Sequence, residues 1–225
     1  MKKLLSIAVF AVFSASSAIS ASLTPSVGVS YNNAGYAAEG IERTFREDGT
    51  GDTTTQEHGA FAANYGSVFL ELGVGELLAF GVDYVVGDIE TPTNTSREGA
   101  TKSTVSAKFK DLTTVYAKMN IPFLNGTYVK AGYSQVDVDV NESMASGNTY
   151  ADVDTEGYMA GIGYNHELTS GLSIRLEATA SIFEDVKTDN GIAAGSGTPA
   201  NGGRNEVTVE SMWGAKGTLS LVKTF

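Results

Sequence analysis

The sequence predicts an all-β fold, an eight-stranded antiparallel up-and-down transmembrane β-barrel. Three observations support this prediction. Apolar and polar residues alternate along most of the chain, short turns alternate strictly with long polar loops, and no long apolar run follows the N-terminal segment. A period of two places one face of a strand in apolar and the other in polar surroundings. Segments of about ten such residues, with short turns at one end and long loops at the other, are typical of membrane barrels.

The first 21 residues have the features of a secretory signal peptide. Lys2 and Lys3 form a positive start, residues 4–13 are apolar, and small residues follow up to Ala21. The apolar run is shorter than the roughly 20 residues that a spanning helix needs. We therefore expect a signal peptide over 1–21, with its exact cleavage site open, and a barrel domain over 22–225.

The composition excludes some classes of function. The chain of 225 residues carries a formal net charge of −11 and no cysteine. Nucleic-acid binding needs cations against the phosphate backbone, so we expect no nucleic-acid partner. An exported chain without cysteine has no disulfide framework, and closure of the barrel would stabilise it instead.

Eight strands follow from the alternating segments in chain order. We expect them over residues 25–40, 60–72, 77–90, 103–122, 127–140, 153–167, 171–187 and 205–225. The first is the least regular, because "NNAGYAAEG" has little alternation, so the strand count stays open there. Short turns are expected at 73–76, 123–126 and 168–170, and long polar loops at 43–59, 91–102, 141–152 and 188–204. This rhythm places all turns at one end of the barrel and all loops at the other.

The orientation of the strands can be argued from residues 172–182, "LSIRLEATASI". Every second residue is apolar, and Ser173, Arg175 and Glu177 lie between them. A secreted β-sandwich would turn the apolar face towards a core. In a membrane barrel that face meets lipid, and closure removes the sheet edges that lipid cannot satisfy. The strict rhythm of turns and loops favours the barrel, with polar residues inside.

The last strand carries a motif in which Gly217, Leu219, Leu221 and Phe225 alternate towards a terminal aromatic residue. With this ending, the chain resembles the small outer-membrane β-barrel proteins, the family related to the membrane domain of OmpA and to OmpX. The resemblance implies the outer membrane of a Gram-negative bacterium, recognition of the last strand by the barrel assembly machinery, and contact with outer-membrane lipids. Lys223 departs from the pattern, but a lysine at the rim can snorkel.

With the apolar residues outward, charges of both signs point inward. The predicted lumen network consists of Glu71, Asp83, Lys108, Lys110, Lys118, Lys130, Arg175, Glu177, Glu210 and Lys216. The phase of the fourth strand is ambiguous, and we place Val105, Ala107, Phe109, Val115, Ala117 and Met119 outward, because a lysine at the bilayer midplane costs about 2–4 kcal/mol. An eight-stranded barrel is just wide enough to be filled by its side chains, so these charges are expected to pair as a plug.

Five carboxylates are expected on the outer face of the hairpin made by the fifth and sixth strands. They are Asp137, Asp139, Asp152, Asp154 and Glu156. Carboxylate oxygens are ligands for Ca²⁺ and Mg²⁺, and such an ion could link the protein to lipopolysaccharide phosphates. A solvated acidic hairpin without a metal ion is the alternative, and no cofactor is otherwise expected.

The function predicted from these features is a non-enzymatic, monomeric surface protein whose loops contact lipopolysaccharide or external partners. A small porin-like channel for ions or for small or hydrophobic solutes is the first alternative. A lipid-modifying outer-membrane enzyme is the second, with His58 beside Glu57 as its only candidate base at the loop end. The second histidine, His166, is expected at the turn end. The sequence does not name the loop ligand, nor does it decide whether the lumen conducts.

Overall fold

The structure is a computed structural model that describes residues 22–45, 52–98, 101–143, 149–192 and 204–225. The predicted signal peptide, residues 1–21, lies outside the described residues. The strands are β1 (Leu23–Phe45), β2 (Thr53–Val74), β3 (Leu78–Val86), β4 (Ile89–Glu90), β5 (Asn94–Glu98), β6 (Thr101–Asn120), β7 (Thr127–Ser143), β8 (Val153–Thr169), β9 (Leu172–Phe183), β10 (Val186–Asp189) and β11 (Arg204–Thr224). No helix long and apolar enough to cross a membrane occurs in this described part of the chain.

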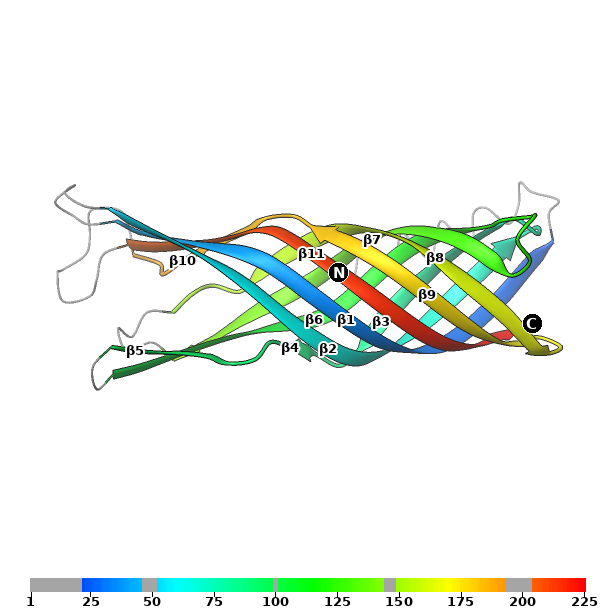
Figure 1. The fold of residues 1–225 in the computed structure, drawn as a ribbon, viewed down its shortest axis with the longest axis horizontal. Helices are drawn as coiled ribbons and strands as arrows, with labels where there is room; N and C mark the ends of the chain where they lie inside the picture. Colours follow the sequence, from blue (N-terminus) through cyan, green and yellow to red (C-terminus); the bar gives the residue numbers. More distant parts are fainter. Residues whose placement is uncertain (1–21, 46–51, 99–100, 144–148, 193–203) are drawn as a thin grey trace.

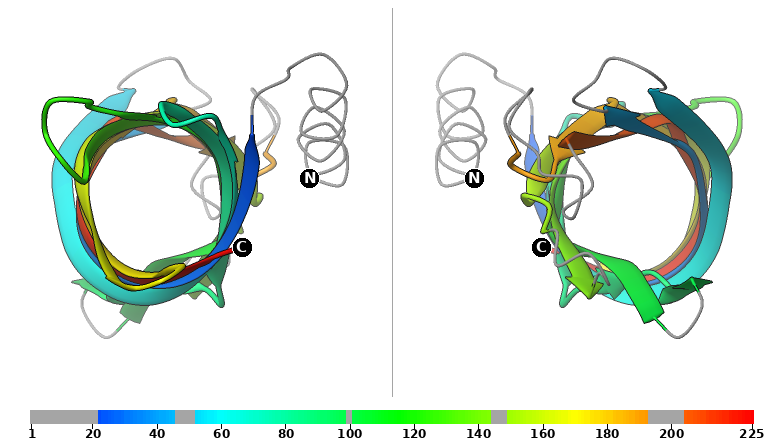
Figure 2. Two further views of the ribbon diagram at one scale, coloured as in Figure 1. Left: turned by 90° about the vertical axis from the view of Figure 1, so that its right-hand side faces the viewer. Right: turned by 90° about the vertical axis from the view of Figure 1, so that its left-hand side faces the viewer.

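All strands belong to one antiparallel sheet that closes on itself (Figures 1 and 2). β3, β4 and β5 pair in turn with β6, and β9 and β10 pair in turn with β11, so that the eleven strands form eight spans of a ring. The ring closes where β1 pairs with β11, from Ser26 opposite Thr224 to Phe45 opposite Arg204. The predicted eight-stranded up-and-down barrel is confirmed.

The strands are strongly tilted against the barrel axis, as Figure 1 shows. The stagger can be followed from strand to strand around the ring, starting at Gly35 of β1. Each residue in the following series is the register partner of the one before it: Ala215, Ala180, Ala160, Ala131, Ala117, Phe80, Leu72 and finally Pro25 of β1. One circuit returns to β1 ten residues away from its start. Strand number and stagger together fix the barrel width, and a ring of this size encloses a lumen that side chains fill.

Side chains alternate between the lumen and the outer surface. On β2, Leu70 is 67% exposed and Glu71, the next residue, is 6% exposed. Many large apolar side chains are exposed, among them Val29, Tyr31, Phe80, Ile162, Leu176, Trp213, Leu219 and Leu221. The apolar face is therefore on the outside and the polar face is in the lumen.

The irregular first segment is one continuous strand, β1, so the open strand count is settled at eight spans. The loop expected over 43–59 is largely wrong, because β1 continues to Phe45 and β2 starts at Thr53. β7 likewise runs on to Ser143. The polar ends of β1, β2 and β7 are paired through backbone hydrogen bonds, which do not require apolar side chains. The alternation of apolar and polar residues therefore does not show that these segments are strands. These strands are therefore longer than a strand needs to be to cross the hydrocarbon core of the membrane.

Two β-bulges change the phase of long strands. On β6, Lys110 pairs with Asp137 and Thr113 pairs with Gln135, so two residues oppose one, and Asp111 has φ 53°. On β11 the register shifts opposite Ala37 and Glu39, and Ser211 has φ 52°. A bulge of this kind moves every later side chain to the other face of the strand.

Candidate functional site

The lumen near the turn end contains a charged cluster centred on Glu71. Arg175 donates two hydrogen bonds to the two Glu71 oxygens, from Nη1 at 2.9 Å and from Nη2 at 3.1 Å. Lys118 Nζ donates to Glu71 Oε1 at 2.6 Å, and the Tyr116 hydroxyl donates to Oε2 at 3.1 Å. The side chains of Glu71 and Arg175 are each 4% exposed. Charges this deep are stable only when they are paired and hydrogen-bonded in this way.

A second ion pair extends the cluster towards the loop end. Lys130 Nζ lies 3.2 Å from Glu177 Oε2, and the Tyr128 hydroxyl donates to Glu177 Oε1 at 2.7 Å. The two parts are joined by aromatic rings, since Lys130 Nζ lies 3.9 Å from the centre of the Tyr116 ring and Lys118 Nζ lies 5.1 Å from that of Tyr128. The cations are thus held by both carboxylates and ring faces.

Aromatic rings fill the lumen by lying over glycines of the neighbouring strand. The register pairs are Gly28 with Phe69, Gly81 with Tyr116, Gly163 with Tyr128 and Gly214 with Tyr36. A Cβ atom at any of the first three would lie 2.2 or 2.3 Å from a ring atom. The absence of a side chain at these glycines is therefore what allows the rings to lie flat against the wall.

Seven of the ten predicted lumen charges share this interior. Besides the five of the two ion-pair groups, Asp83 accepts a hydrogen bond from Ser67 at 3.2 Å. Lys216 projects into the same interior from β11, between the inward Gly214 and Thr218.

Lys108 and Lys110 are not in the lumen, and their predicted position is wrong. The bulge at Asp111 reverses β6, so both lysines lie on the outer face beyond it. Lys108 Nζ lies 2.8 Å from Glu90 Oε1, and Lys110 pairs with Asp139. The same reversal turns Phe109 inward, contrary to its predicted outward position.

Glu210 is also misplaced by the prediction. The register shift at Ser211 places Glu210 opposite Glu39. Glu39 lies on the same face of β1 as Ala37, and Ala37 is the register partner of the outward Trp213. Glu39 lies 4.0 Å from His58, a residue with a 76% exposed side chain. Glu210 therefore belongs to the outer surface.

The loop half of the lumen holds an apolar cluster that the sequence did not predict. Ala34, Tyr65, Val85 and Ile89 are buried, and Tyr36, Phe61, Ala63, Phe109 and Leu112 pack against them. Phe61 of β2 stacks on Tyr36 with a centroid distance of 5.2 Å and on Phe109 with 5.9 Å. Regular alternation would have placed Phe109 outside, so only knowledge of the bulge could have revealed this cluster.

The five carboxylates of the acidic hairpin do not form one metal site. Asp137 and Asp154 are direct register partners, but Asp139 pairs with Lys110, Glu156 accepts from Gln135 at 2.8 Å, and Asp152 accepts from the Val140 amide at 3.0 Å. Within the described residues, no three histidine or acidic side chains are grouped to hold a metal ion. The five carboxylates are therefore not gathered into one site, because strand pairing gives most of them separate partners.

Asp137 and Asp154 nevertheless affect each other. Partial burial, together with the neighbouring Asp154 carboxylate, raises the pKa of Asp137 above its ordinary range. The pair lies beyond Tyr133 and Tyr158, which contact each other with ring centroids 5.5 Å apart on the outer face.

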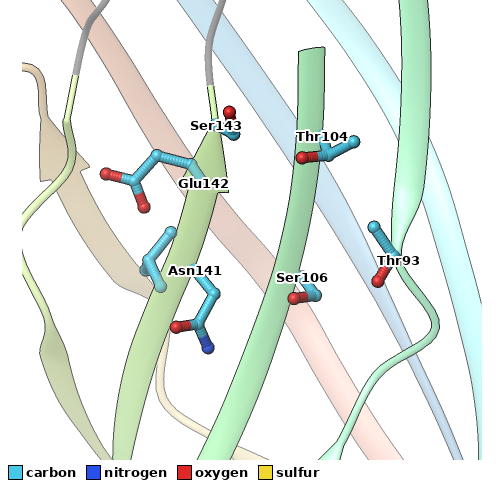
Figure 3. A pocket seen from close by; sticks show the side chains of 7 residues that line it. Thr93, Thr104, Ser106, Asn141, Glu142 and Ser143 are labelled. Atoms are coloured by element: carbon cyan, nitrogen blue, oxygen red, sulfur yellow. The ribbon is translucent and has the colours of Figure 1, made fainter. Parts of the chain in front are cut away.

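A shallow polar pocket lies on β6, β7 and the segment just before β5, at the loop end (Figure 3). It is lined by Thr93, Thr104, Ser106, Val140, Asn141, Glu142 and Ser143. Ser106 is opposite Asn141, and Thr104 is opposite Ser143. The lining is mainly polar and offers hydroxyl and amide groups and the carboxylate of Glu142.

The residues of the terminal motif all face outward. Leu219, Leu221 and Phe225 are 50%, 47% and 74% exposed, and Gly217 is exposed as well. His166, the second histidine, stacks on Tyr164 near the turn end, far along the barrel from His58.

Comparison with known proteins agrees with this architecture. The family model of the outer membrane protein beta-barrel domain matches residues 5–197. No curated protein sequence matches the chain. The crystal structure of OprG from Pseudomonas aeruginosa is similar, with a TM-score of 0.59, 9% identity and coverage of 92% of this chain and 99% of that one. Ail from Yersinia pestis matches with a TM-score of 0.40, 10% identity and coverage of 88% and 99%. The chain therefore belongs to the family of β-barrel proteins of the Gram-negative outer membrane.

Proposed function

We propose that the protein is a non-enzymatic surface protein whose loop end faces the outside of the cell and contacts lipopolysaccharide. The observation that carries the proposal is the combination of a filled turn half with a long strand extension. Paired charges and rings occupy the turn half of the lumen. We infer that these groups leave no continuous aqueous path there, whereas the extended strands offer surface above the lipid.

The outer face of β6 and β7, with the segment before β5, supports contact with the sugars and phosphates of lipopolysaccharide. Its pocket carries short hydroxyl and amide side chains, and Lys108 and Lys110 lie on the same face. We also propose that Ca²⁺ or Mg²⁺ bridges lipid phosphates and the outer carboxylates. The protein is further proposed to be a monomer that the barrel assembly machinery inserts.

The test measures lipopolysaccharide binding to the purified protein in detergent by native mass spectrometry. Ser106→Leu combined with Asn141→Leu should weaken binding at least tenfold. Gln56→Leu, an exposed change on β2, is the matched control and should leave binding unchanged. Equal binding by all three proteins would refute the proposed surface.

A second candidate, passage of a hydrophobic solute, is favoured by the apolar cluster in the loop half of the lumen. It predicts that vesicles with the protein take up an apolar fluorophore faster than empty vesicles, and that Phe61→Asp slows uptake. Planar-bilayer recordings separate both proposals from an ion channel, because sustained conductance steps would contradict a filled lumen.

A further inference from the structure

The outer part of β2 has a ladder on one side only. β2 pairs with β1 without interruption from Val74 to Thr53, but its pairing with β3 ends at Gly66. β4 and β5 form their ladders with β6. In the described part of the chain, the stretch 53–65 therefore has an unpaired edge beside the seam to β4 and β5.

The direction of its backbone groups follows from one hydrogen bond. Gly75 directly follows β2, and its amide donates to the Ser22 carbonyl at 3.0 Å. The backbone of this odd-numbered residue therefore bonds towards β1. In an antiparallel pair, alternate residues bond to one neighbour and the residues between them point the other way. No bulge interrupts β1 and β2. The amides and carbonyls of Thr54, Gln56, His58 and Ala60 hence point into the free edge.

This edge lacks the features that usually prevent pairing. The stretch 53–65, "TTTQEHGAFAANY", contains no proline and no lysine, and residues 53–60 are all exposed. Natural edges are normally short, bulged, or blunted with proline or lysine. The opposite side of the seam does carry such a feature, Pro92, between β4 and β5.

The surroundings of the edge are mainly acidic, although Arg43 of β1 is the register partner of Thr54. Glu57 lies on the edge strand and Glu39 lies next to His58 on the other face of the hairpin. Across the seam, Asp88 and Glu90 both lie within ion-pair distance of Lys108. A basic strand would find a carboxylate beside each of its faces. A second copy fits poorly, because every copy carries a formal net charge of −11 and crosses the membrane in the same direction.

We propose that the β2 edge binds an extended, basic segment of an extracellular protein by β-strand addition. The backbone of the added strand would form hydrogen bonds with the amides and carbonyls of the even-numbered residues Thr54–Ala60. Its lysine or arginine side chains would form ion pairs with Glu39 and Glu57. Main-chain bonds supply affinity and alternate side chains supply selectivity in this mode of recognition. The proposal rests on the loop end facing outside, as proposed above.

The probe is a ten-residue synthetic peptide of alternating lysine and valine or threonine, added to the full chain in nanodiscs. We expect binding by calorimetry, with slowed amide exchange at Thr54, Gln56, His58 and Ala60 but not at the odd-numbered residues between them. A peptide with glutamate for lysine, or with alternate amides N-methylated, should bind at least tenfold more weakly. Exchange that slows equally at odd and even residues, or equal binding of the three peptides, would overturn the proposal.

Two variants make the test specific. Gln56→Pro removes an amide that faces the free edge and leaves the bonds to β1, so peptide binding should fall at least tenfold. Gln56→Thr keeps the amide and should bind within twofold of the original chain. If Gln56→Pro loses heat-modifiable migration and is misfolded, Thr54→Pro replaces it. Unchanged binding by a folded proline variant, or self-association that the variant abolishes, would refute a peptide partner.

Cell-surface labelling distinguishes this failure from failure of the proposed function. Thr54→Cys on intact cells should react with a membrane-impermeant maleimide. No labelling would refute the outward orientation, whereas labelling without peptide binding in nanodiscs would refute only the strand-addition proposal.

Discussion

The two halves of the lumen are enclosed by the same ring but are filled in different ways. Towards the turns, Glu71 and Glu177 are matched by three cations and by rings over glycines. Towards the loops, Phe61, Tyr36 and Phe109 stack in an apolar cluster. The ion pairs need strict geometry because an unpaired buried charge is costly, whereas an apolar cluster tolerates changes of shape. Stability is therefore expected to depend mainly on the turn half.

The largest effect is expected from Glu71→Gln, which leaves Arg175 and Lys118 without a counter-charge. Loss of one member of a buried ion pair costs about 3–5 kcal/mol. Urea unfolding in detergent should show this loss, while Phe61→Leu in the loop half should cost less than about 1.5 kcal/mol. Equal losses for the two variants would contradict the comparison.

The next effect concerns the wall between lumen and lipid. Leu176 is 54% exposed on the outer face, next to the inward Arg175. Leu176→Arg should destabilise the barrel by about 2–4 kcal/mol, because it places a cation in lipid. Folding into vesicles, followed by heat-modifiable migration, measures the loss. Leu176→Ile is the control, and a stable arginine variant would mean that the two faces of β9 are assigned the wrong way round.

Glycine substitutions compare the lumen face of β1 with its outer face through a smaller change. At Gly28 a Cβ would lie 2.2 Å from Phe69, whereas at Gly35 on the same strand it would meet nothing within 4 Å. Gly28→Ala should cost about 1–3 kcal/mol through overpacking. Gly35→Ala should be close to neutral in the same unfolding assay, and Phe69→Leu should restore part of the loss in Gly28→Ala. A neutral Gly28→Ala would show that the ring does not lie over this glycine.

The smallest effect is expected at the acidic hairpin. The raised pKa of Asp137 means that the folded hairpin favours the protonated form. Its contribution to stability is complete at acid pH and is lost as the pH rises through the raised pKa. Asp154→Asn should reduce this dependence, although the part due to burial stays, and should increase amide protection of β7 and β8 at neutral pH by less than about 1 kcal/mol. Identical pH profiles for both proteins would exclude coupling between the two carboxylates.

Much of this architecture could be predicted from the sequence, because lipid forces an apolar outer face and the short turns fix the topology. The positions of Glu71, Arg175 and Glu177 follow from alternation alone. Lys108, Lys110 and Glu210 do not, because the bulges occur at Asp111 and Ser211, where no glycine marks a left-handed conformation. The cluster around Phe61 and the pairing of rings with glycines depend on cross-strand register, which a single sequence does not contain.

The pairing of β1 with β11 also has a consequence for the timing of assembly. Ser26 and Thr224 share a hydrogen bond of 2.9 Å although 198 residues separate them in the chain. Such distant contacts form slowly, because a long stretch of chain must be ordered before they can form. Until β11 arrives, β1 has an open edge that lipid cannot satisfy. Export of the last strand is therefore expected to be the step that permits insertion, so a chain truncated before β11 should remain bound to its chaperones instead of entering the membrane.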